Sequence, residues 1–207
     1  MIKTIFFDFG KVISKPPSKE NWNKLLELSG ISEDIFTERY TAVRGSYDRG
    51  TMKKVDFWSY IVNGQPNGIS KSLVGALAAA DNRCWSDVDQ DVLDWAESIR
   101  SAGFKTGILS NMPDAYAVHI KETMPWFYDF SYHVLSCELQ SIKPEREIYE
   151  AAVNACGDDP PEILFFDDMV ENVEAAKEVG ITAYHYRGLD ELGGKVVKTY
   201  GLPPVPR

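Results

Sequence analysis

Short apolar runs, separated by longer amphipathic stretches, set the pattern of this chain. The runs are five or six residues long. They are rich in β-branched and aromatic residues and do not strictly alternate with polar residues, which is typical of parallel strands covered on both faces. We expect five such strands, at Thr4–Phe9, Lys105–Ser110, Tyr132–Ser136, Glu162–Asp167 and Ile181–Tyr186.

Helical periodicity fills the intervals between the later strands. In Asp91–Ala102 the apolar residues lie three and four positions apart, and Gly103 follows where a glycine commonly ends a helix. The stretches Glu145–Cys156 and Asn172–Val179 have the same pattern and also precede a glycine. Because strands and helices alternate from Asp91 onward, we predict a doubly wound, Rossmann-like α/β core with a parallel sheet.

One interval breaks this alternation. Between residues 15 and 86 the apolar positions have helical spacing and contain no convincing strand. The segment RGSYDRGTM, which contains Arg44 and Arg49, is expected to link two of these helices. We therefore predict a small all-helical cap at 15–86, inserted into a core formed by 1–14 and 87–207. Open α/β sheets bind ligands at the carboxyl edge, so the cap should sit above that edge.

Composition and charge exclude several classes of protein. The 207 residues include 22 Lys and Arg against 31 Asp and Glu, for a formal net charge of −9. This balance argues against nucleic acid and anionic membranes as partners. No apolar run approaches the roughly 20 residues of a membrane span, and the start MIKTIFFDFG turns acidic too early for a signal peptide. Three cysteines without CxxC spacing predict no disulfide framework and a cytoplasmic protein.

Polar side chains follow the predicted strands at their carboxyl ends. These residues are Asp8, Ser110, Asn111, Asp167 and Asp168, with Lys143 in the loop after the third strand. Parallel strands direct such ends toward one crevice. Three close carboxylates repel one another, and one would protonate unless cations compensate. Lys143 supplies one positive charge, and Mg²⁺ is the expected supplement for a site of oxygen ligands.

This set of groups suits phosphoryl transfer. An ionised aspartate such as Asp8 can attack phosphorus and form an aspartyl-phosphate. The cations would stabilise charge on the transferring group, while Ser110 and Asn111 donate hydrogen bonds to its oxygens. Arg44 and Arg49 are candidates for binding an anionic part of the substrate, although a solvated surface arginine is the simpler interpretation.

Four stretches in order resemble the motifs of the haloacid dehalogenase (HAD) superfamily of aspartate-nucleophile hydrolases. They are FFDFGKV, ILSN, IKPEREIY and FFDDMVENVEAA, and the resemblance covers nearly the whole chain. It implies that Asp8 is the nucleophile and a metal ligand, and that Gly10 offers its backbone carbonyl to the metal. It also implies that Asp168 is the main ligand from the fourth motif, with Asp167 binding directly or through water.

The same resemblance assigns the remaining groups. Ser110, with help from Asn111, would bind phosphate oxygens, and Lys143 would bridge Asp8 and the phosphate. Asn172 matches a later position of the fourth motif that is usually acidic. The implied ligand is a small phosphorylated metabolite.

Gly10 departs from the usual DxD of phosphatases in this superfamily, whose second aspartate is the general acid and base. Loss of such a group typically costs about 10²–10⁴-fold in rate. The four motifs also resemble a branch of the superfamily that contains α-D-glucose 1-phosphate phosphatase and has glycine at this position. We therefore predict a Mg²⁺-dependent phosphatase acting on a small phosphate monoester, with a sugar phosphate as one candidate. The alternatives are a metal-independent 2-haloacid dehalogenase and a non-catalytic protein that binds a phosphorylated ligand. The oligomeric state stays open.

Overall fold

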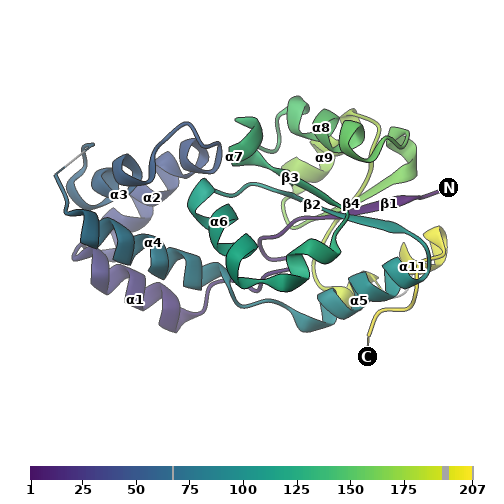
Figure 1. Cartoon of the computed structure of the whole chain (residues 1–207), viewed down its shortest axis with the longest axis horizontal. Helices are drawn as coiled ribbons and strands as arrows, with labels where there is room; N and C mark the ends of the chain where they lie inside the picture. Colours follow the sequence, from purple (N-terminus) through teal and green to yellow (C-terminus); the bar gives the residue numbers. More distant parts are fainter. Residues whose placement is uncertain (67, 193–195, 207) are drawn as a thin grey trace.

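The computed structural model describes residues 1–66, 68–192 and 196–206; residues 67, 193–195 and 207, which fall within the predicted cap and core ranges, lie outside the described residues. Five parallel strands form one sheet in the order β3-β2-β1-β4-β5 (Figure 1). Their bounds are β1 Thr4–Phe7, β2 Lys105–Ser110, β3 Tyr132–Leu135, β4 Ile163–Asp167 and β5 Thr182–His185. The five predicted strands and the doubly wound α/β core are thereby confirmed, with ends that differ by at most two residues.

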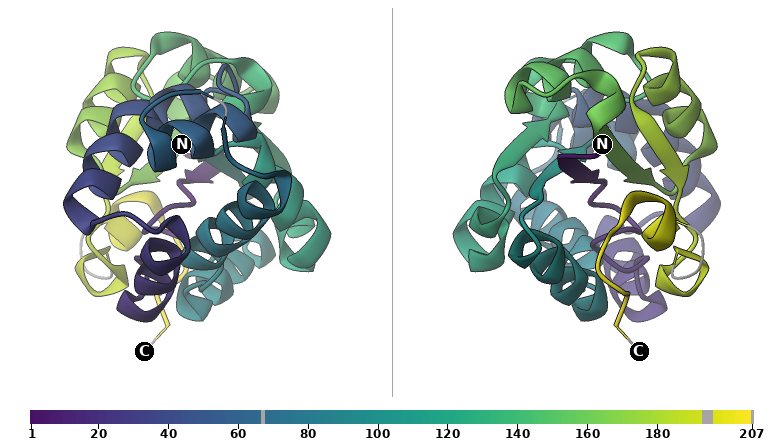
Figure 2. Two further views of the ribbon diagram at one scale, coloured as in Figure 1. Left: turned by 90° about the vertical axis from the view of Figure 1, so that its left-hand side faces the viewer. Right: turned by 90° about the vertical axis from the view of Figure 1, so that its right-hand side faces the viewer.

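Strand β1 lies at the centre of the sheet and contributes to two separate packing layers. Phe6 belongs to the cluster that includes residues of α8 and α9, whereas Ile5 and Phe7 belong to the cluster with residues of α5 and α6. Successive side chains of a strand point to opposite faces, so a strand covered on both faces is apolar at nearly every position. Helices accordingly flank the sheet on both sides (Figure 2).

The helices of the core follow the strands in chain order. They are α5 Gln90–Ser101, α6 Asp114–Thr123, α7 Ser136–Leu139, α8 Arg146–Cys156, α9 Val170–Glu178, α10 Leu189–Leu192 and α11 Val196–Tyr200, with 3₁₀ segments η1 Pro125–Asp129 and η2 Pro160–Glu162. Helices α5, α8 and α9 correspond to the three predicted from periodicity. No helix within the described ranges combines the length and the apolar character that a membrane crossing requires.

Between β1 and α5 the described residues form four helices of a separate lobe, seen beside the sheet in Figure 1. They are α1 Lys19–Ser29, α2 Glu33–Asp48, α3 Lys54–Asn63 and α4 Lys71–Trp85. The lobe has its own hydrophobic core, which includes Leu25, Phe36, Trp58 and Leu77, all without solvent exposure. We propose 15–86 as the extent of this cap.

The prediction that RGSYDRGTM links two cap helices is wrong for its first half. Helix α2 continues through Gly45 to Asp48. A glycine inside a helix costs about 1 kcal/mol, but Tyr47 is buried in the cap core and favours the continued helix. The turn falls at Gly50 instead, where φ is +77° and a Cβ would lie 2.7 Å from the Cys137 carbonyl oxygen. Only glycine fits this close approach.

The end of α2 is attached to the core beside this turn. Arg49 makes a two-pronged ion pair with Glu145, in which one N–O distance is 2.6 Å. The Ser136 hydroxyl donates to the Asp48 carbonyl at 2.6 Å. The Arg49 side chain is 27% exposed and lies outside the lining of the cavity described below. Its guanidinium joins the cap to the core.

Candidate active site

Three carboxylates meet where the order of the sheet reverses. Asp8 directly follows β1, and Asp167 ends the adjacent strand β4. One carboxylate oxygen from each of Asp8, Asp167 and Asp168 lies within 4.8 Å of the others. Such a switch point is the usual ligand site of an open α/β sheet. A compact set of carboxylate oxygens suits a hard divalent cation, and Mg²⁺ fits these donors.

Lys143 bridges two of the carboxylates from within the protein. Its Nζ lies 2.8 Å from Asp8 Oδ1 and 2.6 Å from Asp167 Oδ2, and its side chain is 1% exposed. It also donates to the Leu109 carbonyl at 3.0 Å. Burial by itself lowers the pKa of Lys143, but the charges of Asp8 and Asp167 outweigh burial and raise the pKa above its ordinary value. Lys143 is therefore a fixed cation at the end of β1.

Asp8 is held in a strongly perturbed environment. Burial raises its pKa to about 7; the charge of Lys143 opposes this rise, the charge of Asp167 adds to it, and hydrogen bonds from Lys143 and Ser110 lower it. The Phe9 backbone N–H donates to Asp8 Oδ1 at 2.6 Å. One ammonium does not fully compensate the buried negative charge, so a bound divalent cation would favour the ionised carboxylate.

Asp167 and Asp168 have different surroundings although they are adjacent. Asp167 is fully buried and accepts hydrogen bonds from the Asn172 amide at 3.0 and 3.1 Å and from the Met169 N–H at 2.8 Å. Asp168 lines the cavity and lies 3.3 Å from the Lys11 ammonium. Asn172 thus orients a carboxylate behind the site, while Asp168 and Asp8 face the open space.

Asn111 contacts the backbone of Lys143 through both ends of its amide. Its Oδ1 accepts from the Lys143 N–H at 2.8 Å, and its Nδ2 donates to the Lys143 carbonyl at 2.9 Å. Together these bonds fix the loop that carries the buried ammonium, a role that the sequence did not indicate. Ser110 is 1% exposed and lies beside Asp8, where the sequence placed it.

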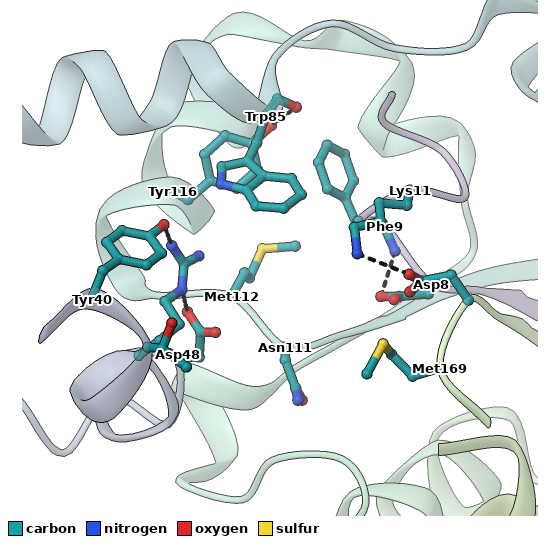
Figure 3. A pocket seen from close by; sticks show the side chains of 14 residues that line it. Asp8, Phe9, Lys11, Tyr40, Asp48, Trp85, Asn111, Met112, Tyr116 and Met169 are labelled. Carbon is teal, nitrogen blue, oxygen red and sulfur yellow. Dashed lines mark hydrogen bonds and ion pairs between the residues drawn. The ribbon is translucent and has the colours of Figure 1, made fainter. Parts of the chain in front are cut away.

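A cavity of about 500 Å³ opens between the carboxylates and the cap (Figure 3). Asp8 lies at one side of it, and Tyr40 and Asp48 of the cap lie at the opposite side. Most of the lining was not found from the sequence, because these side chains carry no chemical signal of their own. These residues are Phe9, Lys11, Tyr40, Thr41, Asp48, Trp85, Met112, Tyr116 and Met169. Some lie in α2, α4 and α6, and the others lie in the segments that follow β1, β2 and β4.

Arg44 is held inside the cavity wall, so its interpretation as a solvated surface arginine is wrong. Its Nε lies 2.7 Å from Asp48 Oδ1 and its Nη1 3.4 Å from Asp81 Oδ2. Nη1 also donates to the Tyr40 hydroxyl. The guanidinium carbon lies 5.2 Å from the centre of the Tyr40 ring and 5.9 Å from that of Trp85. One cation therefore serves two buried carboxylates and is already neutralised.

The Arg44 cluster predicts a pH-dependent stability. Burial raises the pKa of Asp48 to about 6; the charge of Arg44 opposes this, and that of Asp81 adds to it. Because the folded-state pKa exceeds the ordinary one, the contribution of Asp48 to stability is complete below about pH 4 and is lost as pH rises through 6. We compare the free energy of unfolding of Asp48→Asn with that of the wild type. We expect the variant's value, relative to the wild type, to rise by on the order of 2 kcal/mol between pH 4 and pH 7.5.

Urea unfolding at the two pH values measures this shift, with Asp94→Asn on an exposed face of α5 as the control. The control removes an exposed carboxylate, so the difference between its free energy of unfolding and that of the wild type should be the same at both pH values. A constant difference for Asp48→Asn as well would contradict the expected titration.

Comparison with known proteins assigns the chain to one family. The model of the haloacid dehalogenase-like hydrolase family matches residues 2–180. The chain is similar to the sesquiterpene phosphatase astK of Aspergillus oryzae, with 23% identity over 184 residues that cover 88% of this chain and 89% of that protein.

Solved structures share the fold. A HAD family enzyme from Bacteroides thetaiotaomicron in complex with magnesium has a TM-score of 0.73 and 25% identity, covering 89% of this chain and 93% of that one. The same enzyme is known with magnesium and inorganic phosphate. The L-2-haloacid dehalogenase of Xanthobacter autotrophicus with chloropropionic acid covalently bound has a TM-score of 0.65 and 18% identity, covering 99% and 85%. Because the family model matches most of its length, the chain belongs to the haloacid dehalogenase-like hydrolases.

Proposed function

We propose that this hydrolase is a Mg²⁺-dependent phosphatase that acts on a small phosphate monoester through an aspartyl-phosphate at Asp8. The observation that carries the proposal is the placement of Asp8 beside the buried Lys143 and within 4.8 Å of two further carboxylates, at the edge of the cavity under the cap. A dehalogenase has less use for the adjacent Asp167 and Asp168. The phosphatase name of the Aspergillus relative and the magnesium and phosphate complex of the Bacteroides enzyme support the same choice.

In this mechanism the residues of the chain position and polarise the ester. Mg²⁺, held by Asp8, Asp168 and the Gly10 carbonyl with Asp167 behind them, would supply positive charge against the phosphate oxygens. Asp8 attacks phosphorus, the P–O bond to the alcohol breaks, and water then hydrolyses the aspartyl-phosphate. Lys143 keeps Asp8 oriented and stabilises charge on the transferring group, and Ser110 donates to its oxygens.

The leaving oxygen must be protonated by a group other than residue 10, because Gly10 has no side chain. Gly10 lines the cavity without a side chain, and a Cβ there would lie 3.6 Å from Trp85 Cζ3. Within the described residues, the other acidic side chains of the cavity wall are Asp8, Asp48 and Asp168. We infer that water or the Asp48 side of the cap supplies the proton, at a cost in rate relative to an enzyme with a dedicated acid.

The test is phosphate release from a panel of monoesters, with Mg²⁺ and with EDTA. The panel includes glucose 1-phosphate, the candidate that the sequence suggested. We expect release with Mg²⁺ and a loss of at least about 10²-fold with EDTA, because the carboxylates would then face the ester dianion without the cation.

The same samples separate the alternatives. Chloride release from 2-chloropropionate that is indifferent to EDTA would replace the phosphatase with a dehalogenase. Stabilisation of the protein by a phosphate ester without any turnover would indicate a non-catalytic binding protein.

A further inference from the structure

We propose that the physiological substrate is the phosphate monoester of an uncharged, largely apolar alcohol rather than of a sugar. This inference rests on the proposed phosphatase function and concerns only the part of the cavity that receives the alcohol. Its basis is the state of the polar groups in the cavity wall, which are bonded to one another and leave apolar surface for the ligand.

The polar hydrogens of the aromatic residues in the wall are already donated within the protein. The Tyr40 hydroxyl donates to Asp81 at 2.8 Å, and the Tyr116 hydroxyl donates to the Trp85 carbonyl at 2.8 Å. The Trp85 indole is hydrogen-bonded to Asp81, where it lowers the pKa of that carboxyl. These residues therefore present ring carbons to the cavity, beside Phe9 and the Met112 side chain (Figure 3).

The charged groups of the cap wall are likewise paired. Arg44 is shared between Asp48 and Asp81, so this side carries no uncompensated cation for a second anionic group. Asn111 is bonded to the Lys143 backbone. Among the described lining residues outside the catalytic end, Thr41 has the one side-chain polar group with no bond assigned to it, and it is exposed.

A hexose would enter this cavity at a disadvantage. Each hydroxyl that is buried without a partner lowers affinity by roughly tenfold. The ester of an alcohol of the same shape that lacks ring hydroxyls avoids this loss of affinity. Its binding is also favoured by the removal of apolar surface from water. Pockets that select sugars carry convergent polar groups, which this wall does not offer.

A matched pair of esters tests the proposal. Cyclohexylmethyl phosphate and glucose 6-phosphate are both primary esters on a six-membered ring, and they differ mainly in the ring hydroxyls. We expect the wild type with Mg²⁺ to hydrolyse cyclohexylmethyl phosphate with a kcat/KM at least about tenfold higher. We expect the Asp8→Asn variant, which cannot turn over, to bind it with a Kd at least about tenfold lower by titration calorimetry.

The two readouts separate the possible failures. Turnover that favours glucose 6-phosphate overturns the substrate class while the phosphatase function stands. Preferential binding of cyclohexylmethyl phosphate without turnover supports the substrate class and overturns the phosphatase function. Equal binding of the two esters, or binding of neither, overturns the substrate class.

Adding polar atoms to the cavity wall should reduce the preference for cyclohexylmethyl phosphate over glucose 6-phosphate. Met169→Gln and Met112→Gln keep the side-chain shape and add hydrogen-bonding atoms; Met169 is 40% exposed, so its variant is expected to fold even if the variant of the buried Met112 does not. We expect the tenfold preference to fall by about threefold or more. Val170→Thr is the control, because Val170 is exposed and lies outside the lining. An unchanged preference in Met169→Gln would contradict the assignment of this wall to the alcohol.

Discussion

Replacing Asp8 with asparagine is expected to reduce phosphate release by at least about 10⁴-fold, because the carboxylate that forms the covalent intermediate is lost. The amide has the same shape and retains acceptor capacity for the Phe9 N–H, which lies 2.6 Å from the Asp8 oxygen. Burial already disfavours the charge at this position and raises the pKa of Asp8 to about 7. We therefore expect the variant to fold, and thermal unfolding should show this alongside the rate.

The control for Asp8→Asn is Asp94→Asn, which makes the same chemical change on an exposed face of α5. It should retain the activity of the wild type. If Asp8→Asn released phosphate at more than about 1% of the wild-type rate while folded, Asp8 would not be the nucleophile, and the attacking group would have to be water or another side chain.

Replacing Lys143 with methionine is expected to impair both stability and activity. The side chain is 1% exposed, and its ammonium lies within 2.8 Å of one carboxylate and 2.6 Å of another. Removal of one partner of a buried ion pair leaves uncompensated charge and typically costs about 3–5 kcal/mol. We expect a loss of this size in urea unfolding at pH 8 without Mg²⁺, and a fall in activity of at least about 10³-fold.

The stability defect of Lys143→Met should shrink when Mg²⁺ is added, because a bound cation compensates the same carboxylates and stabilises the folded state by mass action. Lys11→Met is the comparison for stability. Its ammonium pairs with Asp168, but its side chain is 47% exposed, so the cost should stay below about 1 kcal/mol. Equal effects of the two substitutions would show that Lys143 does not compensate the buried charge.

The sheet was predictable because its signal is local. Each central strand is a short run of mostly apolar residues, and in β1 the two packing layers take the consecutive apolar side chains Ile5, Phe6 and Phe7. The catalytic end followed from topology, because parallel strands bring their carboxyl ends to one edge. Asp8 could therefore be grouped with Asp167 and Asp168 from the sequence, although this pair lies about 160 positions further along the chain.

The end of α2 was less predictable, because local and tertiary preferences conflict there. Gly45 weakens the local helical signal, and the segment reads as a loop. Burial of Tyr47 against Phe57, with ring centres 4.0 Å apart, favours the helix through contacts that the local sequence does not display. The continued helix brings Arg44 and Asp48 onto the cavity wall.

By itself, the sequence determined the α/β core, the helical insertion and the acidic end of the site, because these depend on periodicity and on the order of strands. The tertiary structure decided which polar groups remain open to a ligand. The Asn111 amide is hydrogen-bonded to the backbone of Lys143, 32 positions away, and the Arg44 guanidinium is paired with the Asp81 carboxylate, 37 positions away. A side chain's capacity to bind a substrate depends on what else it touches, and those partners come together only when distant segments pack.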